Sequence, residues 1–155
     1  MAGLSPLPAP PPRSVTADTL GAWLLKGDPR HDEVSGLLRT GFADLTTRCV
    51  RRSYRSDLVA AGQPVLYWVS GRHPDHPAGL RGQGEVLGPV VDDPDAGPVV
   101  PLRLRPLDPP VLRSELVDHP VLADLEVLRM PAGSNPSYVT VDQLAALREG
   151  WSQVG

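Results

Sequence analysis

The sequence predicts an α+β domain built on a small, strongly curved, mixed β-sheet, a pseudo-barrel of five or six strands with flanking helices. Three observations predict it. Short apolar segments rich in β-branched and aromatic residues alternate with Gly- and Pro-rich turns. One of these segments is interrupted by several glycines, which is typical of strands that bend or approach another backbone closely. Helical spacing of apolar residues occurs only in short stretches between the strands and after them.

The first elements follow from turn and cap residues. A strand is expected at Ala22–Lys26, because this apolar run is ended by Gly27-Asp28-Pro29. A helix is expected over Glu33–Arg39, with Asp32 as its N-terminal cap and Gly41 as its stop.

The middle of the chain contains the clearest strand. Ala43–Val50 alternates weakly and predicts a strand, and Ser53–Ala60 predicts one or two helical turns. Pro64–Ser70 is β-branched and aromatic and is the strongest strand signal. Alternation along it separates two sets of side chains onto opposite faces: Leu66, Trp68 and Ser70 on one, and Val65, Tyr67 and Val69 on the other.

The C-terminal half also predicts short strands and short helices. Leu80–Val91 predicts the glycine-interrupted strand, and Val99–Leu107 alternates cleanly between apolar and basic residues. Short helices are expected from Ser114 and from about Val121, and a last one at Val141–Arg148.

Length and composition indicate a single domain. A chain of 155 residues with 41% apolar content fits one domain of ordinary size. Residues 1–19 are expected to form a disordered, Pro-rich N-terminal tail, since five prolines precede Arg13. Residues 20–155 are expected to form the domain.

The compartment expected for this chain is the cytoplasm. Cys49 is the only cysteine, so an intrachain disulfide is excluded, which fits a reducing compartment. No run approaches the ~20 apolar residues that span a bilayer, and the first residues lack the pattern of a signal peptide. We expect no membrane association.

Charge is distributed unevenly along the chain. The net charge of −3 argues against strong non-specific binding of nucleic acid. However, Arg48, Arg51, Arg52 and Arg55 fall within eight residues. The sequence therefore predicts a local basic face on a mildly acidic protein.

Signals for metal, cofactor and catalytic sites are weak. His73-Pro-Asp-His76 has a spacing that occurs in metal sites, but no third or fourth ligand lies nearby in the sequence. The chain lacks Gly-x-Ser-x-Gly, P-loop and HExxH motifs. We expect no metal, no cofactor and no enzyme, and Cys49 is expected to be a buried, inert thiol.

A polar loop and several short motifs resemble the EVE family of PUA-like domains, relatives of the YTH readers of methylated RNA. The loop Arg129–Thr140 offers several hydrogen-bonding groups within a few residues. The matching motifs, in family order, are Trp23–Lys26, Arg48–Arg51 with Tyr54, Gly62-Gln63 with Val65–Ser70, Ala78–Val86, and Leu128–Thr140.

The resemblance implies a PUA-like fold and a concave pocket that binds a modified nucleobase in DNA or RNA. A flipped or single-stranded base offers a face for stacking and a polar edge for hydrogen bonds. Two residues depart from the family pattern. Arg48 stands where the family has tryptophan, and Arg81 stands where it has an aromatic or aliphatic residue.

The ligand-binding residues expected from this resemblance come from four segments. They are Lys26, Arg48 with Cys49, Trp68 with Ser70, and Ser134 with Asn135. Trp68 or Arg48 is expected to stack on the base, and Ser134 or Asn135 to read its edge. Arg51, Arg52 and Arg55 are expected to contact the nucleic-acid backbone.

Core packing remains the alternative for Trp68, and turn capping the alternative for the Ser134–Asn135 pair. Two other functions also remain open: a protein-interaction module without a ligand, and a small nucleoside hydrolase like those among ASCH domains, with Lys26 and Glu85 in its pocket.

Overall fold

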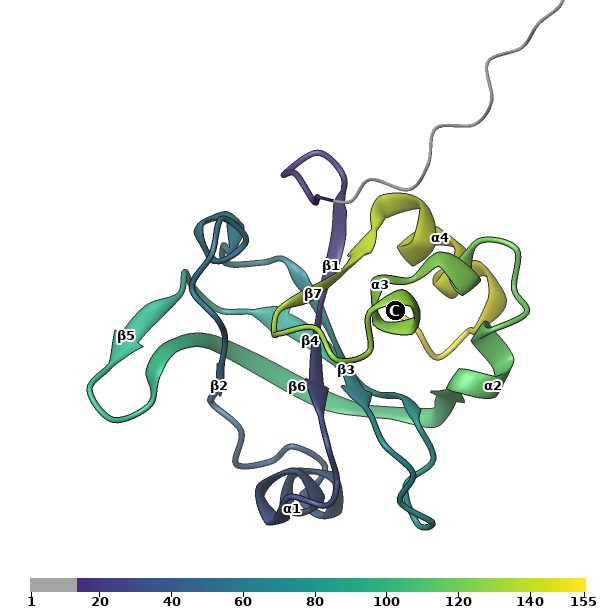
Figure 1. Ribbon diagram of the computed structural model, residues 1–155, viewed down its shortest axis with the longest axis horizontal. Coiled ribbons are helices and arrows are strands. Elements are labelled where there is room, and N and C mark those ends of the chain that lie inside the picture. The colour runs from purple at the N-terminus through teal and green to yellow at the C-terminus, as the bar shows by residue number, and fades with distance from the viewer. Residues whose placement is uncertain (1–13) are drawn as a thin grey trace, which may run out of the picture.

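The computed structural model describes residues 14–155, which fold into one curved, open β-sheet with short helices around it (Figure 1). The strands are β1 (Leu20–Gly27), β2 (Thr47–Cys49), β3 (Pro64–Val69), β4 (Gly79–Val86), β5 (Val91–Asp93), β6 (Gly97–Leu112) and β7 (Ser137–Thr140). The helices are α1 (Asp32–Thr40), α2 (Arg113–Leu116), α3 (Glu126–Arg129) and α4 (Val141–Gly150), with 3-10 turns η1 (Ser56–Leu58) and η2 (Leu122–Asp124).

The sheet is mixed and has seven strands in the described part of the chain. Its order is β2-β6-β4-β3-β1-β7, and β5 pairs with β6 beside that path. β1 and β3 are parallel, and the other pairs are antiparallel. The α+β class and the mixed sheet are confirmed. The expected strand number is too low, because β5 is only three residues long and β7 emerges from the loop predicted at Arg129–Thr140.

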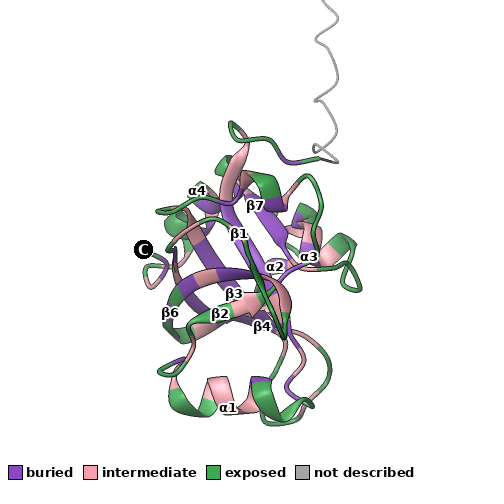
Figure 2. Cartoon of the chain, turned by 90° about the vertical axis from the view of Figure 1, so that its left-hand side faces the viewer, coloured by how far each residue is buried: buried purple, intermediate pink, exposed green. Residues whose placement is uncertain are grey.

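Alternation along the central strands divides the core into two layers. Trp23, Leu25 and Tyr67 pack on one face of the sheet, under α1 and β2. Leu24 and Trp68 pack on the other face, under helices α2–α4, which gather on one side of the sheet in Figure 1. Because both faces are covered, β1 and β3 are almost fully buried (Figure 2). The predicted assignment of Trp68 and Tyr67 to opposite faces is confirmed.

The glycines of β4 allow the close contacts that the sequence predicts there. A Cβ at Gly84 would lie 1.8 Å from the carbonyl oxygen of Arg103, so only glycine lets β6 approach at this point. A Cβ at Gly82 would lie 2.8 Å from the ring of Phe42.

The helices agree with the prediction in position more than in length. α1 ends at Gly41 (φ 63°), which adopts the left-handed conformation expected of a helix stop. The turns expected at Ser53–Ala60 reduce to η1, and the helix expected from about Val121 divides into η2 and α3. α4 begins with a capping box in which Thr140 and Gln143 satisfy each other's backbone N–H groups.

The ordered fold begins earlier than predicted. Residues 14–19 were expected in the tail, but Val15 is only 2% exposed and packs into the core. Thr16 forms a turn whose carbonyl accepts from the N–H groups of Thr19 and Leu20. The predicted tail at 1–13 lies outside the described residues. Within residues 14–155, no helix has the length and apolarity needed to cross a bilayer.

Candidate functional site

A cavity of about 360 Å³ opens between two loops that are far apart in the sequence. We call Arg51–Arg55 the basic loop and Met130–Pro136 the polar loop. Glu126 of α3 also lines the cavity. Its volume falls within the range of ~300–1,000 Å³ typical of small-molecule sites and is large enough for a single nucleobase. The structure thus brings together Arg51, Arg52, Arg55, Ser134 and Asn135, as the sequence predicts.

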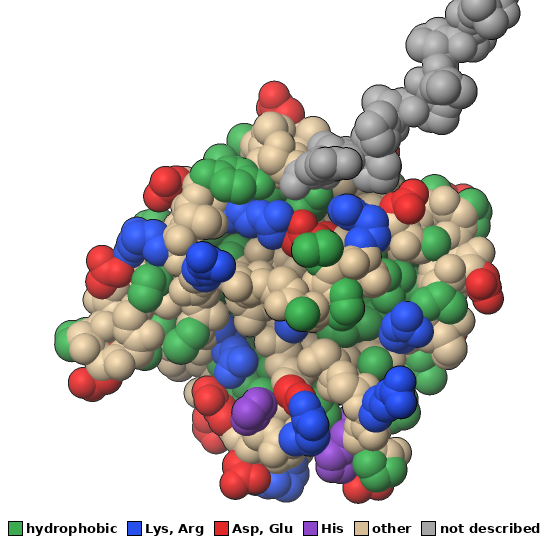
Figure 3. Space-filling model, in the orientation of Figure 1, with side chains coloured by type: hydrophobic (Ala, Val, Ile, Leu, Met, Phe, Trp, Pro, Cys, Tyr) green, Lys and Arg blue, Asp and Glu red, His purple; other side chains and the backbone are tan. Residues whose placement is uncertain are grey.

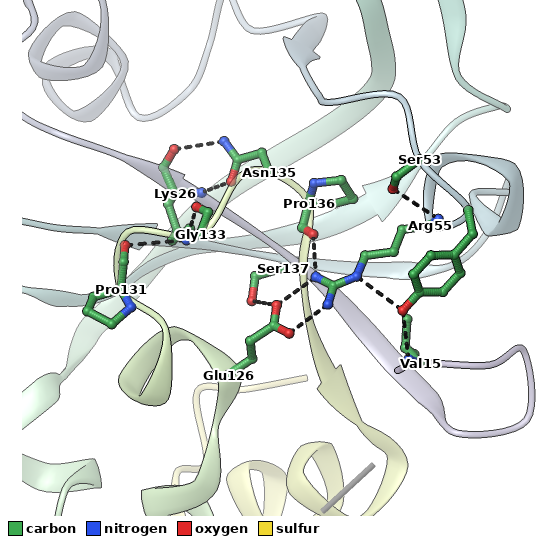
Figure 4. A network of polar contacts seen from close by, with 11 residues as sticks. Val15, Lys26, Ser53, Arg55, Glu126, Pro131, Gly133, Asn135, Pro136 and Ser137 are labelled. Atoms are coloured by element: carbon green, nitrogen blue, oxygen red, sulfur yellow. Dashed lines mark hydrogen bonds and ion pairs between the residues drawn. The ribbon is translucent and has the colours of Figure 1, made fainter. Parts of the chain in front are cut away.

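Asn135 fixes the polar loop to the end of β1. Its Oδ1 accepts from the backbone N–H of Lys26 at 2.9 Å, and its Nδ2 donates to the Lys26 carbonyl at 3.1 Å. The side-chain amide therefore pairs with β1 as a strand neighbour would (Figure 4). Asn135 forms the wall of the site, but its amide is already engaged.

Lys26 clamps the same loop through its ammonium group. Nζ donates to the carbonyl oxygens of Pro131, at 3.4 Å, and Gly133 (Figure 4). Burial lowers the pKa of Lys26; the charge of Glu126 opposes this effect and that of Arg55 adds to it. Lys26 thus stands behind the polar loop and is half-buried beside the cavity.

Arg55 and Glu126 form a bidentate ion pair across the floor of the site. Both distances are 2.7 Å, and the side chains are 18% and 13% exposed. Arg55 also donates to the Pro136 carbonyl at 3.0 Å, and its guanidinium lies 5.0 Å from the ring centre of Tyr138. Ser137 donates a further hydrogen bond to Glu126 at 2.9 Å. This network joins the basic loop, α3 and β7.

The network sets the ionisation of both partners. Burial opposes the charge of Glu126, but the hydrogen bonds from Arg55 and Ser137 outweigh it and lower the pKa of the carboxyl below its ordinary value of 4.5. The hydrogen bond to Glu126 raises the pKa of Arg55 despite its burial. Both groups are therefore charged at neutral pH.

Two apolar side chains remain available at the cavity. Tyr54 is 49% exposed and Met130 is 58% exposed, and both line the site. The Tyr54 hydroxyl accepts from the Val15 N–H at 3.2 Å, which anchors the ring on one side. An anchored but exposed aromatic ring is a suitable platform for stacking.

The rim of the cavity is basic. Arg51 donates its backbone N–H to the Asn135 carbonyl at 2.8 Å, while its exposed guanidinium has no polar partner within residues 14–155. Arg52 forms an exposed ion pair with Asp92. Figure 3 shows Lys and Arg side chains over this face, with Asp and Glu mostly toward its edges.

Trp68 and Ser70 do not belong to this site. Trp68 is 3% exposed and packs with Leu66 in the layer beneath the helices, so the prediction that it stacks on a ligand is wrong and core packing is its role. Ser70 donates from both its hydroxyl and its N–H to the Gly27 carbonyl, which ties the ends of β1 and β3 together.

Arg48 and Cys49 also lie outside the cavity lining. The Arg48 guanidinium pairs with Glu33 at 3.1 Å, lies 5.7 Å from the ring centre of Tyr67 and is 13% exposed. It covers the sheet at the position where a tryptophan was expected, so it offers no free plane to a base. Cys49 was expected to be buried, but it is exposed on the edge strand β2, and its Sγ faces the Ala96 carbonyl at 3.9 Å.

Arg55 needs a correction as well. It was expected to contact the nucleic-acid backbone, but its guanidinium is occupied by Glu126 and Pro136. Because these bonds use its terminal nitrogens, Arg55 shapes the cavity instead of offering a free charge.

The hydrolase pairing of Lys26 with Glu85 is not supported. Lys26 pairs in register with Trp68, whereas Glu85 lies opposite Pro64, four residues away along β3. At ~3.3 Å per residue this separates the two positions by about 13 Å along the strand direction alone, and they also lie on opposite sides of β3. Glu85 instead forms an exposed ion pair with Arg103.

The histidine pair lacks the partners of a metal site. The rings of His73 and His76 lie 5.0 Å apart. In the described part of the chain, no group of three or more His, Cys, Asp or Glu side chains is placed to hold a metal ion.

Six residues that line the cavity were absent from the predicted list: Ser53, Tyr54, Glu126, Met130, Gly133 and Pro136. The sequence does mark Tyr54 as a candidate site residue, because an aromatic residue inside a basic run is typical of nucleic-acid contacts. No sequence pattern marks Glu126 as a site residue, since an acidic residue in a short helix is usually solvated.

Comparison of the sequence with known proteins does not assign the chain to a family. No known protein family matches the chain as a sequence profile. A segment of 76 residues is 33% identical to neurexin-2-beta and to neurexin-2 of Mus musculus. It covers 49% of this chain but only 12% and 4% of those proteins.

Comparison by structure shows the fold. A hypothetical protein from Leishmania major superposes with a TM-score of 0.65 at 19% identity, over 89% of this chain and 99% of its own. An NMR structure from Rhodopseudomonas palustris gives 0.61 at 21% identity, over 84% and 92%. A crystal structure from Agrobacterium tumefaciens gives 0.59 at 19% identity, over 84% and 92%. The overall fold is therefore shared with these proteins over most of the described chain.

Proposed function

We propose that this chain is a PUA-like, EVE-like binding module that holds a modified nucleobase of DNA or RNA in the cavity between the basic loop and the polar loop. The observation that carries the proposal is the half-exposed Tyr54, which lines a cavity of nucleobase size beside Arg51, whose guanidinium has no polar partner among residues 14–155. Tyr54 stacks on the base, and Arg51 and Arg52 contact the phosphates.

The roles differ from those expected from the sequence. Trp68 is buried and Arg48 is paired with Glu33, so neither is free to stack on a base. In this proposal Tyr54 stacks on the base instead. Asn135 positions the loop, and Ser134, which is exposed at the cavity wall, contacts the polar edge of the base. We propose a binding role and not a catalytic one. The carboxylate in the cavity, that of Glu126, is already held by three hydrogen bonds.

Replacing Tyr54 with alanine is expected to weaken binding of a short single-stranded oligonucleotide that carries the preferred modified base. Base stacking on one aromatic side chain is worth ~1–3 kcal/mol, so the loss should be at least about fivefold in Kd. A titration of the purified protein against methylated and hydroxymethylated oligonucleotides measures it. If Tyr54→Ala binds the oligonucleotide with the same Kd as the wild type, the ring has no stacking role. If the protein captures a protein partner and binds no nucleic acid, the interaction module is favoured.

Replacing Arg51 with glutamine is expected to weaken binding equally for all base sequences and to make it less dependent on salt. Each phosphate contact on a single strand contributes ~0.7 to the slope of log K against log salt concentration. Arg39, which lies at the end of α1 away from the cavity lining, is the matched control. A similar change of slope in Arg39→Gln would show that only overall charge matters.

A further inference from the structure

A smaller cavity, of about 230 Å³, opens at the C-terminal end of α1 and shares no lining residue with the cavity between the basic loop and the polar loop. We call it the Arg81 cavity. Most of its lining is apolar: Leu38, Phe42, Pro106, Leu107 and Pro110. The polar residues that line it are His76, Arg81 and Asp108. A mostly apolar lining with a few polar groups is typical of small-molecule sites.

A β-bulge in β4 directs Arg81 to this cavity. Leu80 and Gly82 have register partners in both β3 and β6, whereas Arg81 between them has none. Leu80 packs beneath the helices, while a Cβ at Gly82 would meet the Phe42 ring on the other face of the sheet. In a regular strand these two residues would share a face. Bulges re-aim side chains in this way, so the fold sets Arg81 apart from the regular ladder.

The Arg81 guanidinium has fewer partners than its burial requires. One terminal nitrogen donates to the Pro77 carbonyl at 3.1 Å. Among residues 14–155, its buried Nε meets no acceptor and no acidic side chain forms an ion pair with it. Burial lowers the pKa of Arg81, and no neighbouring charge in the same part of the chain offsets this effect. Because an arginine stays charged in proteins, Arg81 is a half-buried cation without compensation.

Other shielded arginines of the chain are compensated. The side chains of Arg48 and Arg55 are 13% and 18% exposed, and each pairs with a glutamate. Asp108 lines the Arg81 cavity but is exposed and forms no ion pair with Arg81. An anion in the cavity would therefore supply the partner that the described chain does not.

We propose that the Arg81 cavity binds a small monocarboxylate with an apolar body, whose carboxylate pairs with the Arg81 guanidinium. The planar guanidinium matches the two oxygens of a carboxylate, and the apolar lining receives the body of the ligand. A phosphate group carries more charge and a third acceptor oxygen, which a lining with one guanidinium and the Asp108 carboxylate does not match. The volume lies below the ~300–1,000 Å³ of drug-sized ligands, so the ligand is small.

This site goes beyond the proposed function and does not depend on it. Hexanoate and hexanol test it, because the two molecules share an apolar chain and differ in charge. Titrations of the full chain, followed by the amide chemical shifts of Leu38, Phe42 and Arg81, give both dissociation constants. Hexanoate is expected to bind at least about tenfold more tightly than hexanol, as a charge-assisted hydrogen bond predicts. Acetate, which lacks the apolar body, should bind more weakly than hexanoate.

Three variants assign the binding to this cavity. Arg81→Met replaces the uncompensated charge with an unbranched apolar side chain, so the fold should persist and the affinity for hexanoate should fall to that for hexanol. Arg105→Met is the matched control, since it removes an exposed charge of β6 outside the lining and should leave the affinity unchanged. Asp108→Asn removes a like charge from the lining and should tighten hexanoate binding about two- to fivefold.

Equal affinities for hexanoate and hexanol would overturn the proposal, as would hexanoate binding that Arg81→Met leaves unchanged. The proposal also fails if hexanoate does not bind at high millimolar concentration, or if Asp108→Asn binds it no more tightly than the wild type. Should Arg81→Met unfold, the wild type and Asp108→Asn still decide the question with the same two ligands.

Discussion

Replacing Glu126 with alanine is expected to lower the free energy of unfolding by about 3–5 kcal/mol, because it leaves the largely buried charge of Arg55 without its partner. Of its hydrogen bonds, the guanidinium would keep only those to the Pro136 carbonyl and, weakly, to the Tyr54 hydroxyl. Since the ion pair joins α3 to the basic loop, the cavity should lose its shape as well. Denaturant unfolding of the purified variant measures the change.

Glu85→Ala is the matched control for this prediction. Glu85 also pairs with an arginine, but the two side chains are 46% and 71% exposed. Exposed ion pairs contribute about 0–1 kcal/mol, so this variant should unfold almost as the wild type does. Equal losses in Glu126→Ala and Glu85→Ala would mean that the Arg55–Glu126 pair is no more important than a surface contact.

The same pair predicts a dependence on pH. The pKa of Glu126 is lower in the folded protein than its ordinary value of 4.5, so its stabilising contribution is complete above that value. The contribution is lost as the pH falls below 4.5 and through the folded pKa. The stability difference between wild type and Glu126→Gln should therefore narrow on acidification, and a difference that stays constant would contradict this assignment.

Replacing Asn135 with alanine is the second large effect, an expected loss of about 2–3 kcal/mol in the free energy of unfolding. Its side chain satisfies both the N–H and the carbonyl of Lys26. Leaving a buried polar group unpaired costs ~1–3 kcal/mol, and because these two groups are only partly buried each should cost near the lower end of that range. The polar loop should then detach from the end of β1, and nucleic-acid binding should fall with it.

Ser134→Ala gives the comparison one residue away. Ser134 is exposed, and its hydroxyl makes no hydrogen bond within the described chain, so stability should change by less than ~0.5 kcal/mol. Thermal unfolding of the two variants side by side separates loop anchoring from ligand contact. A stable Asn135→Ala protein with an intact loop would contradict the anchoring role.

The central part of the fold could be predicted from local patterns. Alternation in Pro64–Ser70 places Trp68 and Tyr67 on opposite faces, and the glycines of β4 predict close contact with a neighbour. Alternation cannot say what covers each face. Trp68 meets helices that follow it in the chain by more than forty residues, so its burial could not be predicted from its own strand.

The site could be predicted only in part for the same reason. The basic run and the polar loop have local signals, and the structure brings them together. The Arg55–Glu126 pair links positions 71 residues apart, and no local pattern marks Glu126 as its partner. Arg48 and Arg55 look alike in the sequence, yet Arg48 pairs with α1 and Arg55 with α3.

The most direct test of the binding site is an amide chemical-shift titration of the full chain with a single-stranded oligonucleotide that carries one modified base. The proposed site predicts perturbations at the amides of Arg51–Arg55 and of Gly133, Ser134 and Asn135, and none at Gly62 or Gly84, which line a second cavity on another part of the sheet. Perturbations centred on Gly62, Gly84 and Arg105, with the two loops unaffected, would contradict it.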